Sequence, residues 1–409
     1  MQNVLKRGRR LPEISEERKT RTSSPRLARL SDESVRALLV QFLFLTAVVG
    51  FLVFLVFNTL ANLESRGIET GFGFLARESG FGINQTLIPY TETSSFGWVF
   101  VVGLLNTLLV SALGIVLATL LGFLIGIARL SRNWLIARFA TVYIETFRNV
   151  PLLLQVFFWY VSVLTALPHP RNSHALGEAV FLNQRGLFVP RPLLLEGAGL
   201  VLGAAVAAVV AIFLLAHWSR RHRERTGRPL PVIRYALLLL IGLPGVAFFV
   251  AGQPLSWEFP ALRGFNFQGG LSIIPELTAL LVALTIYTAA FIAEIVRAGI
   301  QSVPHGQTEA ASALGLNRSQ RLRLVLIPQA LRVIIPPLTS QYLNLLKNSS
   351  LATAIGYPDL VNIFAGTSAS IAGQAIEIIT MTMAVYLVVS LSISAFMNWY
   401  NARIALAER

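Results

Sequence analysis

Charged side chains interrupt the long apolar segments of this sequence at two related places. Glu145 and Arg148 are three residues apart, and Glu294 and Arg297 repeat the arrangement. Residues three apart share one face of a helix, so each pair is predicted to form an ion pair. A charge at the centre of a membrane costs roughly 2.5–3.5 kcal/mol on insertion scales, which favours a functional role. The alternative is that both pairs are interfacial salt bridges that fix helix ends close to water.

A second polar group surrounds Lys347, near the end of a later apolar segment. Its amine can snorkel to water, or it can join neighbouring amide and hydroxyl groups in lining a polar path. The candidate lining of a translocation path comprises Glu145, Arg148, Glu294, Arg297, Asn344, Lys347, Asn348, Ser349 and Ser350.

Other chemistries find no support in the sequence. There is no cysteine, which excludes disulfides and thiol catalysis. The five histidines show no HxxxH or HExxH spacing, so no metal site is predicted. No phosphate-binding Gly-x-x-x-x-Gly-Lys-Ser/Thr loop occurs, and we expect this chain to bind neither ATP nor another cofactor. The formal charge of +14 does not indicate nucleic acid, because the basic residues lie in short segments between apolar runs.

The composition indicates lipid as the solvent of the elements that carry these residues. Hydrophobic residues make up 54% and charged residues only 13%, against about 25% charged in soluble domains. The mean hydropathy is +0.64. Unpaired backbone groups are costly in lipid, so apolar runs of about 20 residues are predicted to be helices. The prediction is an all-α, polytopic transmembrane helix bundle with about eight spans, at 36–57, 98–127, 138–165, 195–217, 234–252, 275–298, 331–349 and 375–398.

Arginines in the connecting loops predict the orientation. The segment 218–228 holds five arginines, whereas 350–374 holds none. By the positive-inside rule, the arginine-rich loops and both termini are expected in the cytoplasm. The basic tail 1–35 is expected to lie near anionic headgroups, with no cleavable signal peptide, and 401–409 is a cytoplasmic C-terminal tail.

Two pairs of glycines have the spacing that lets membrane helices approach closely. They are Gly122 with Gly126, and Gly199 with Gly203. Close helix packing is predicted at both. The spans that hold Gly199 and follow it have no charge deep inside and are interpreted as peripheral helices.

The loop 299–330 is too structured for a simple connection. Helix formers occupy 307–314, and Gly315 is well placed to end that helix in the left-handed conformation. Asn317 can cap a second helix with Gln320. Pro328 and the Pro336-Pro337 pair predict a bend into the next span. The first helix is expected to expose Ala310 and Ala311 so that another protein can approach; the alternative is an amphipathic helix on the membrane surface.

This loop resembles the EAA loop of ABC importer permeases. The resemblance rests on the order Glu-Ala-Ala, Gly, Ile-Pro, found here from Glu309 to Pro328. In that family the loop is the coupling helix that docks on a cytoplasmic ATPase. The coupling residues that the resemblance implies are Gly306, Gln307, Glu309, Ala310, Ala311, Gly315, Ile327 and Pro328.

Three further stretches are similar to polar amino-acid permeases, namely 143–155, 292–300 and 347–351. With them, 96–165 and 275–400 correspond to the two parts of a type I permease core. The first span with its outer loop, 36–95, and the inserted 166–274, which carries two extra spans, lengthen the chain. This layout is similar to a permease subunit of general L-amino-acid importers.

The resemblance implies a non-catalytic subunit that translocates polar or many L-amino acids across a bacterial inner membrane. Its implied partners are a cytoplasmic ATPase dimer that uses ATP, a second homologous permease as a heterodimer, a periplasmic amino-acid-binding protein and membrane lipid. The alternative is a secondary amino-acid transporter or channel without ATP coupling, in which internal repeats are expected. The Glu145/Arg148 and Glu294/Arg297 stretches give only a weak echo of such a repeat.

Overall fold

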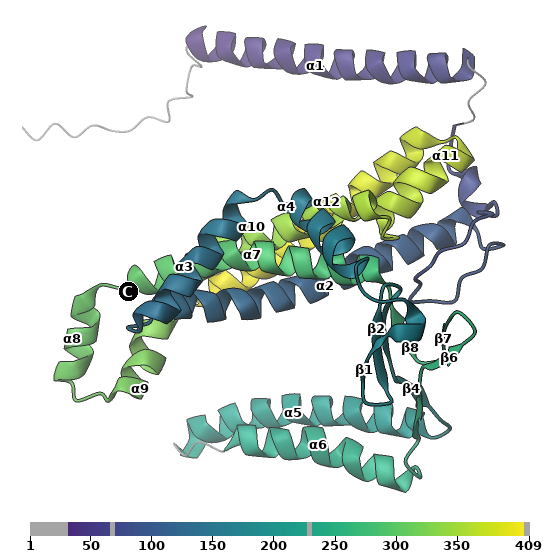
Figure 1. Ribbon diagram of the computed structural model, residues 1–409. Helices are drawn as coiled ribbons and strands as arrows, with labels where there is room; N and C mark the ends of the chain where they lie inside the picture. The colour runs from purple at the N-terminus through teal and green to yellow at the C-terminus, as the bar shows by residue number, and fades with distance from the viewer. Residues whose placement is uncertain (1–31, 66–69, 227–230, 405–409) are drawn as a thin grey trace, which may run out of the picture. The chain divides into compact units, whose positions relative to one another are not determined.

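A computed structural model describes residues 32–65, 70–226 and 231–404 of the chain (Figure 1). The chain divides into two compact units, Met1–Glu69 and Thr70–Arg409. The described part of the first is one helix, α1 (Asp32–Ser65), whose large apolar side chains are exposed from Val35 to Phe57. Residues 1–31 of the tail predicted at 1–35 lie outside the described residues. Residues 405–409 of the predicted C-terminal tail lie outside them too.

The second unit is mainly helical. Its first helical elements are η1 (Gly73–Ala76), α2 (Phe96–Arg129), α3 (Trp134–Asn149), α4 (Leu152–Phe157), the π-helical η2 (Phe158–Leu164), η3 (Pro170–Asn172), α5 (Ala198–Thr226) and α6 (Val232–Val250). The remaining ones are α7 (Pro275–Gln301), α8 (His305–Ala313), α9 (Arg318–Arg321), the π-helical η4 (Leu322–Leu326), α10 (Ile327–Asn348), η5 (Ser349–Ile355), the π-helical η6 (Leu360–Ser368), α11 (Ala369–Ala372) and α12 (Ala375–Ile404).

The described residues contain seven helices long and apolar enough to cross a membrane, or eight if one bent pair counts as a span. The bent pair is the third predicted span, and its prediction as one continuous helix is wrong. α3 ends at Asn149, and α4 with η2 leaves at 105° after Pro151. Pro151 has no N–H to donate and disfavours helical geometry in Val150 before it, which accounts for the break there.

The centre of the second unit is the contact between α2 and α7. A Cβ built on Gly122 would lie 2.6 Å from the Cβ of Ile292, and one on Gly126 would lie 2.7 Å from the carbonyl oxygen of Ala293. Only glycine permits this distance, so the close packing predicted from the Gly122–Gly126 spacing is confirmed. α10 packs on α7, and α12 packs on α10 (Figure 1).

Buried polar groups fix the link between η5 and η6 to α2. Asn106 donates from Nδ2 to the carbonyl oxygen of Pro358 at 2.8 Å, and Tyr357 donates its hydroxyl to the carbonyl oxygen of Asn106 at 3.1 Å. The N–H of Leu360 donates to Thr107 Oγ1 at 3.0 Å. Asp359 caps η6, since its Oδ1 accepts from the N–H of Asn362 at 2.8 Å.

The inserted segments contain short strands that the helical prediction missed. The strands are β1 (His174–Leu176), β2 (Val180–Asn183), β3 (Gly186–Val189), β4 (Arg191–Leu194), β5 (Leu255–Glu258), β6 (Ala261–Arg263), β7 (Asn266–Gln268) and β8 (Leu271–Ile273). An antiparallel sheet has the order β1-β2-β3-β8, while β4 pairs with β5 and β6 with β7. Leu187 faces Ile273 across β3 and β8, so the two insert loops are joined directly before α7 begins.

α5 and α6 form an antiparallel helical hairpin that leaves the sheet through β4 and returns through β5 (Figure 1). The close packing predicted at Gly199 and Gly203 is wrong for the described chain, because a Cβ on either would meet nothing within 4 Å. α6 approaches α5 over another face, where Ala208 of α5 and Ala247 of α6 are buried.

Candidate translocation pocket and coupling loop

A pocket of about 240 Å³ lies between α7 and α10. Gln341, Asn344 and Asn348 are spaced by three and four residues, so they share one face of α10. The residues that line the pocket are Tyr287, Thr288, Phe291, Gln341, Asn344 and Asn348. Of the residues predicted for a path, the structure therefore brings Asn344 and Asn348 together and adds four that were not singled out.

The other members of the Lys347 group lie elsewhere. Lys347 is exposed and does not line the pocket. Ser349 is fully buried, with its Oγ donating to the carbonyl oxygen of Leu346 at 2.7 Å, and it does not line the pocket. Ser350 donates its hydroxyl to the carbonyl oxygen of Lys347 at 2.7 Å. Helical geometry turns Ser349 and Ser350 away from the face that Asn344 and Asn348 share.

Charged side chains gather where α2 ends beside α3 and α7. Arg129, in the last turn of α2, forms an ion pair with Glu294 and lies 3.8 Å from Glu145. Arg297 donates from Nε to both oxygens of Glu294 at 3.1 Å, as the sequence predicted. The predicted Glu145–Arg148 pair is wrong: Glu145 faces Arg129 instead. Arg129 was not singled out from the sequence, so its role as the bridge between Glu145 and Glu294 was missed.

Arg148 takes a different partner. Its guanidinium carbon lies 5.2 Å from the centroid of the Phe291 ring, a cation–π distance. Phe291 also lines the pocket, so one ring separates the pocket from the charged cluster. Arg129, Arg148 and Arg297 outnumber Glu145 and Glu294, which leaves the cluster with a net positive charge.

The glycine turn of the loop 299–330 follows the predicted geometry. α8 ends before Gly315, which has φ +73°. The N–H of Gly315 donates to the carbonyl oxygen of Ser312 at 2.9 Å, and that of Leu316 donates to the carbonyl oxygen of Ala311 at 3.1 Å. These two bonds are the Schellman pattern that satisfies the last carbonyls of a helix. Asn317 and Gln320 form a capping box, which confirms the start predicted for the second helix.

The second helix of the loop does not end at the prolines. α9, η4 and α10 form one candidate span from Arg318 to Ile355, so the boundary expected between the loop and the next span is wrong. The π-helical turn Leu322–Leu326 directly precedes Ile327 and Pro328. Pro328 stands in the first turn of α10, where its missing N–H costs little because the turn before it has an altered hydrogen-bond pattern.

The exposed surface of α8 differs from the prediction at one residue. Ala310 is exposed, but Ala311 is only 4% exposed, because α8 folds back toward η4. Leu314 is 80% exposed at the end of the helix and was not among the predicted coupling residues. A lone leucine at the end of a polar helix was the signal for it.

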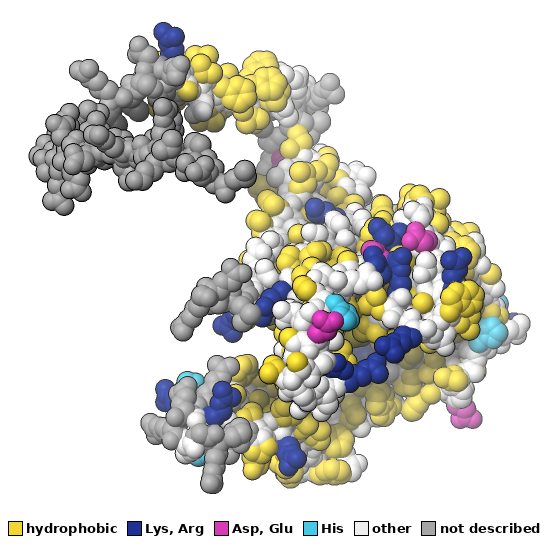
Figure 2. All heavy atoms as spheres, turned by 90° about the vertical axis from the view of Figure 1, so that its left-hand side faces the viewer, with side chains coloured by type: hydrophobic (Ala, Val, Ile, Leu, Met, Phe, Trp, Pro, Cys, Tyr) yellow, Lys and Arg dark blue, Asp and Glu magenta, His cyan; other side chains and the backbone are white. Residues whose placement is uncertain are grey.

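Exposed polar residues occupy the rest of α8. Gly306, Gln307 and Glu309 are exposed, and Glu309 lies 3.0 Å from Nδ1 of His305. Gln329 donates from Nε2 to Oε1 of Gln307 at 3.3 Å, which ties α8 to the start of α10. Figure 2 shows this end of the unit, where Lys and Arg side chains gather over the core.

The described residues hold no group of three or more His, Cys, Asp or Glu side chains placed for a metal ion. The site instead combines a pocket lined by amides and hydroxyls, a cluster of arginines and glutamates, and a structured loop. On a bundle of membrane-crossing helices, these features define a membrane subunit of a transport system.

The chain belongs to the family of binding-protein-dependent transport system inner membrane components, whose model matches residues 118–406. It is therefore a membrane-spanning permease subunit. The chain is 56% identical to YhdX of Escherichia coli (strain K12), named as an amino-acid ABC transporter permease, over 93% of this chain and 96% of that one. It is 50% identical to the general L-amino acid transport system permease protein AapQ of Rhizobium johnstonii, over 92% and 94%. It is 41% identical to the glutamate/glutamine/aspartate/asparagine transport system permease protein BztB of Rhodobacter capsulatus, over 92% and 96%.

Proposed function

We propose that this chain translocates L-amino acids, polar ones or a broad range, across the cytoplasmic membrane, and that a separate ATPase drives it through the loop 299–330. The observation that carries the proposal is the pocket between α7 and α10, with three amide side chains on one face of a helix. The curated relatives support the substrate class, because their names give amino acids as the cargo.

The pocket chemistry suits a zwitterion. Gln341, Asn344 and Asn348 each carry an amide that both donates and accepts hydrogen bonds, so they can meet an ammonium and a carboxylate alike. Thr288 and Tyr287 add hydroxyl groups. Weak, uncharged contacts suit a path, because a substrate must leave as readily as it enters. Beyond Phe291, the net positive cluster of Arg129, Arg148 and Arg297 favours the carboxylate end of the substrate.

The loop supplies the mechanical input. We infer that the exposed side of α8, with Gly306, Gln307, Glu309, Ala310 and Leu314, docks on the ATPase. Gly315 fixes the turn behind it, while Ile327 and Pro328 carry the movement into α10. ATP is used by the partner and not by this chain.

The expected assembly has four kinds of component. Besides the ATPase dimer, these are a second, homologous permease as a heterodimer, a periplasmic amino-acid-binding protein and the surrounding lipid. The arginines at the α8 end support a cytoplasmic location for that end and for both termini.

Reconstituted transport tests the proposal. The chain, co-purified with its partners, is placed in proteoliposomes, and uptake of radiolabelled glutamine, glutamate and leucine is measured with and without ATP. ATP-dependent uptake of at least one is expected. Asn344→Leu and Asn348→Leu should each lower it about tenfold or more, because an unpaired substrate group in the pocket costs about 1–3 kcal/mol. Thr339→Val, on α10 but outside the pocket, should have little effect. Uptake that needs no ATPase would move the chain to the secondary transporters.

A further inference from the structure

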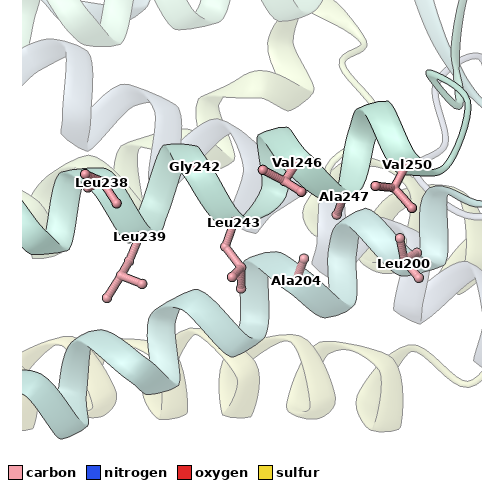
Figure 3. A pocket seen from close by; sticks show the side chains of 9 residues that line it. All are labelled: Leu200, Ala204, Leu238, Leu239, Gly242, Leu243, Val246, Ala247 and Val250. Carbon is pink, nitrogen blue, oxygen red and sulfur yellow. The ribbon is translucent and has the colours of Figure 1, made fainter.

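The α5–α6 hairpin carries a groove that the transport function does not use. The groove has a volume of about 520 Å³ and only apolar lining (Figure 3). Its lining residues are Leu200, Ala204, Leu238, Leu239, Gly242, Leu243, Val246, Ala247 and Val250. Small residues leave space in it: Ala204 and Ala247 lie where the helices meet, and a Cβ on Gly242 would meet nothing within 4 Å. The size is within the range of pockets that hold small molecules.

The groove leads to an arginine at one end. On α6, Leu238, Gly242, Val246 and Val250 follow one another at four-residue intervals, and Arg234 is the next position of the same stripe. Residues four apart lie on one face of a helix, so Arg234 stands one turn beyond the groove. The side chain is exposed, and no ion pair involves it within the described ranges.

More basic side chains lie at the same end of the hairpin as Arg234. Arg221 and Arg223 are exposed near the end of α5, which is the neighbouring end of the antiparallel hairpin. Trp218 is 55% exposed one turn earlier and stacks with His222 at 5.4 Å between ring centroids. Exposed tryptophan and arginine mark the level of lipid headgroups. Figure 2 shows Lys and Arg side chains at this end of the hairpin.

The spacing fits one leaflet of a bilayer. From Arg234 to Gly242 a helix rises roughly 12 Å. Half of a hydrocarbon core is about 15 Å thick. A phosphate beside Arg234 would therefore place an acyl chain along Leu238 and into the space over Gly242.

We propose that the α5–α6 groove binds an anionic phospholipid, with an acyl chain in the groove and its phosphate on Arg234. Charge complementarity favours a lipid over a second apolar helix. The phosphate of a lipid can form an ion pair with Arg234, which has no acidic partner in the described ranges. The lipid lies on the inserted hairpin and thus away from the pocket between α7 and α10. The inference does not depend on which substrate the protein carries.

Native mass spectrometry of the co-purified complex tests the proposal. The complex is delipidated in mild detergent and incubated with dioleoylphosphatidylglycerol or, separately, dioleoylphosphatidylcholine. One tightly held phosphatidylglycerol per copy of this chain is expected, in preference to phosphatidylcholine. Arg234→Gln should lower phosphatidylglycerol retention about fivefold, the effect of one arginine near a headgroup, and remove the preference. Arg138→Gln, an exposed arginine on α3, is the matched control and should retain the wild-type preference.

Filling the groove separates its role from charge alone. Gly242→Leu should lower retention of both lipids about fivefold or more, because the added side chain occupies the space of the acyl chain. Gly245→Leu and Gly203→Leu place the same side chain at open glycines outside the groove and should retain the lipid. Equal retention by Gly242→Leu and its controls would overturn the proposal. So would a Gly242→Leu variant that keeps its lipid but loses a protein subunit, since a helix would then be the occupant.

Discussion

The guanidinium of Arg148 lies over the ring of Phe291, and the same ring lines the pocket between α7 and α10. This contact joins α3, beside the break at Pro151, to the centre of α7. The pocket therefore has an aromatic ring on one side, with an arginine behind that ring.

The contact should appear as a coupling energy between the two residues. In a double-mutant cycle of Arg148→Gln and Phe291→Leu, we expect about 0.5–1 kcal/mol, the value for an exposed cation–π pair. Thermal unfolding of the purified complex measures it. The pair Arg138→Gln with Phe291→Leu provides the reference, because Arg138 makes no cation–π contact within the described chain. Strict additivity in the first cycle would show that the stacking contributes nothing.

Removal of Arg129 should destabilise the fold more than removal of a nearby exposed arginine. Arg129→Gln removes the cation that lies 3.8 Å from Glu145 and one of the two ion pairs of Glu294. We expect a loss of about 1–3 kcal/mol, the usual cost of breaking a hydrogen bond to a charged group. Arg132→Gln, exposed just after α2, is the control and should change stability by less than about 0.5 kcal/mol. Equal losses in the two variants would contradict the bridging role.

Gly315 offers a test of the loop that involves no steric clash. A Cβ there would meet nothing within 4 Å, but φ is +73°, which costs an L-residue roughly 1–2 kcal/mol. We expect Gly315→Ala to lower the transport obtained per ATP hydrolysed, and Gly315→Val to lower it further. Gly245→Ala, on α6 and away from the loop, has equally open space and no positive φ, so it should behave as wild type. Normal coupling in Gly315→Val at equal abundance would refute the role of the turn.

Asp359 predicts a pH dependence of stability. It lies outside the candidate spans, and burial raises the pKa of its carboxyl to about 7, partly offset by the N–H of Asn362. Its Oδ2 is buried without a hydrogen-bond partner. The native state therefore holds a proton that the unfolded chain releases above about pH 4, so stability should fall as pH rises from about 4 to 7.

The size of that effect follows from about 1.4 kcal/mol per pKa unit, which gives a few kcal/mol over the window. Asp359→Asn carries no titrating group there and should flatten the dependence of the unfolding midpoint on pH. The unfolding midpoint is measured for both proteins between pH 4.5 and 8. If its slope against pH is unchanged in Asp359→Asn, the dependence belongs to another group.

Local patterns in the sequence predicted local geometry well. The Gly315 turn, the Asn317 cap and the approach of α2 to α7 at Gly122 each depend on a residue type whose backbone or size decides the outcome. The Glu294–Arg297 pair was predicted from its spacing of three residues, because both residues lie on one helix.

Contacts between distant elements were harder to predict. Glu145 pairs with Arg129 because the loop between α2 and α3 determines how these two helices meet, and helical spacing says nothing about it. Gln341 carried a readable signal, since it shares a face with Asn344 and Asn348. Phe291 carried none, because an apolar ring in an apolar span looks like any other core residue. The strands of the insert are only three or four residues long, too short to produce a clear alternation.

The continuous helix from Arg318 to Ile355 has a consequence for how force passes through the molecule. At 1.5 Å per residue, its 38 residues span roughly 57 Å. Its first residue, Arg318, follows the turn at Gly315, and its later turns carry Asn344 and Asn348. A tilt imposed at the first residues would therefore also move the amides, because both belong to one candidate span. The π-helical turn at Leu322–Leu326 and the Pro336-Pro337 pair interrupt the regular hydrogen bonding of this helix, so we expect it to bend at these places first.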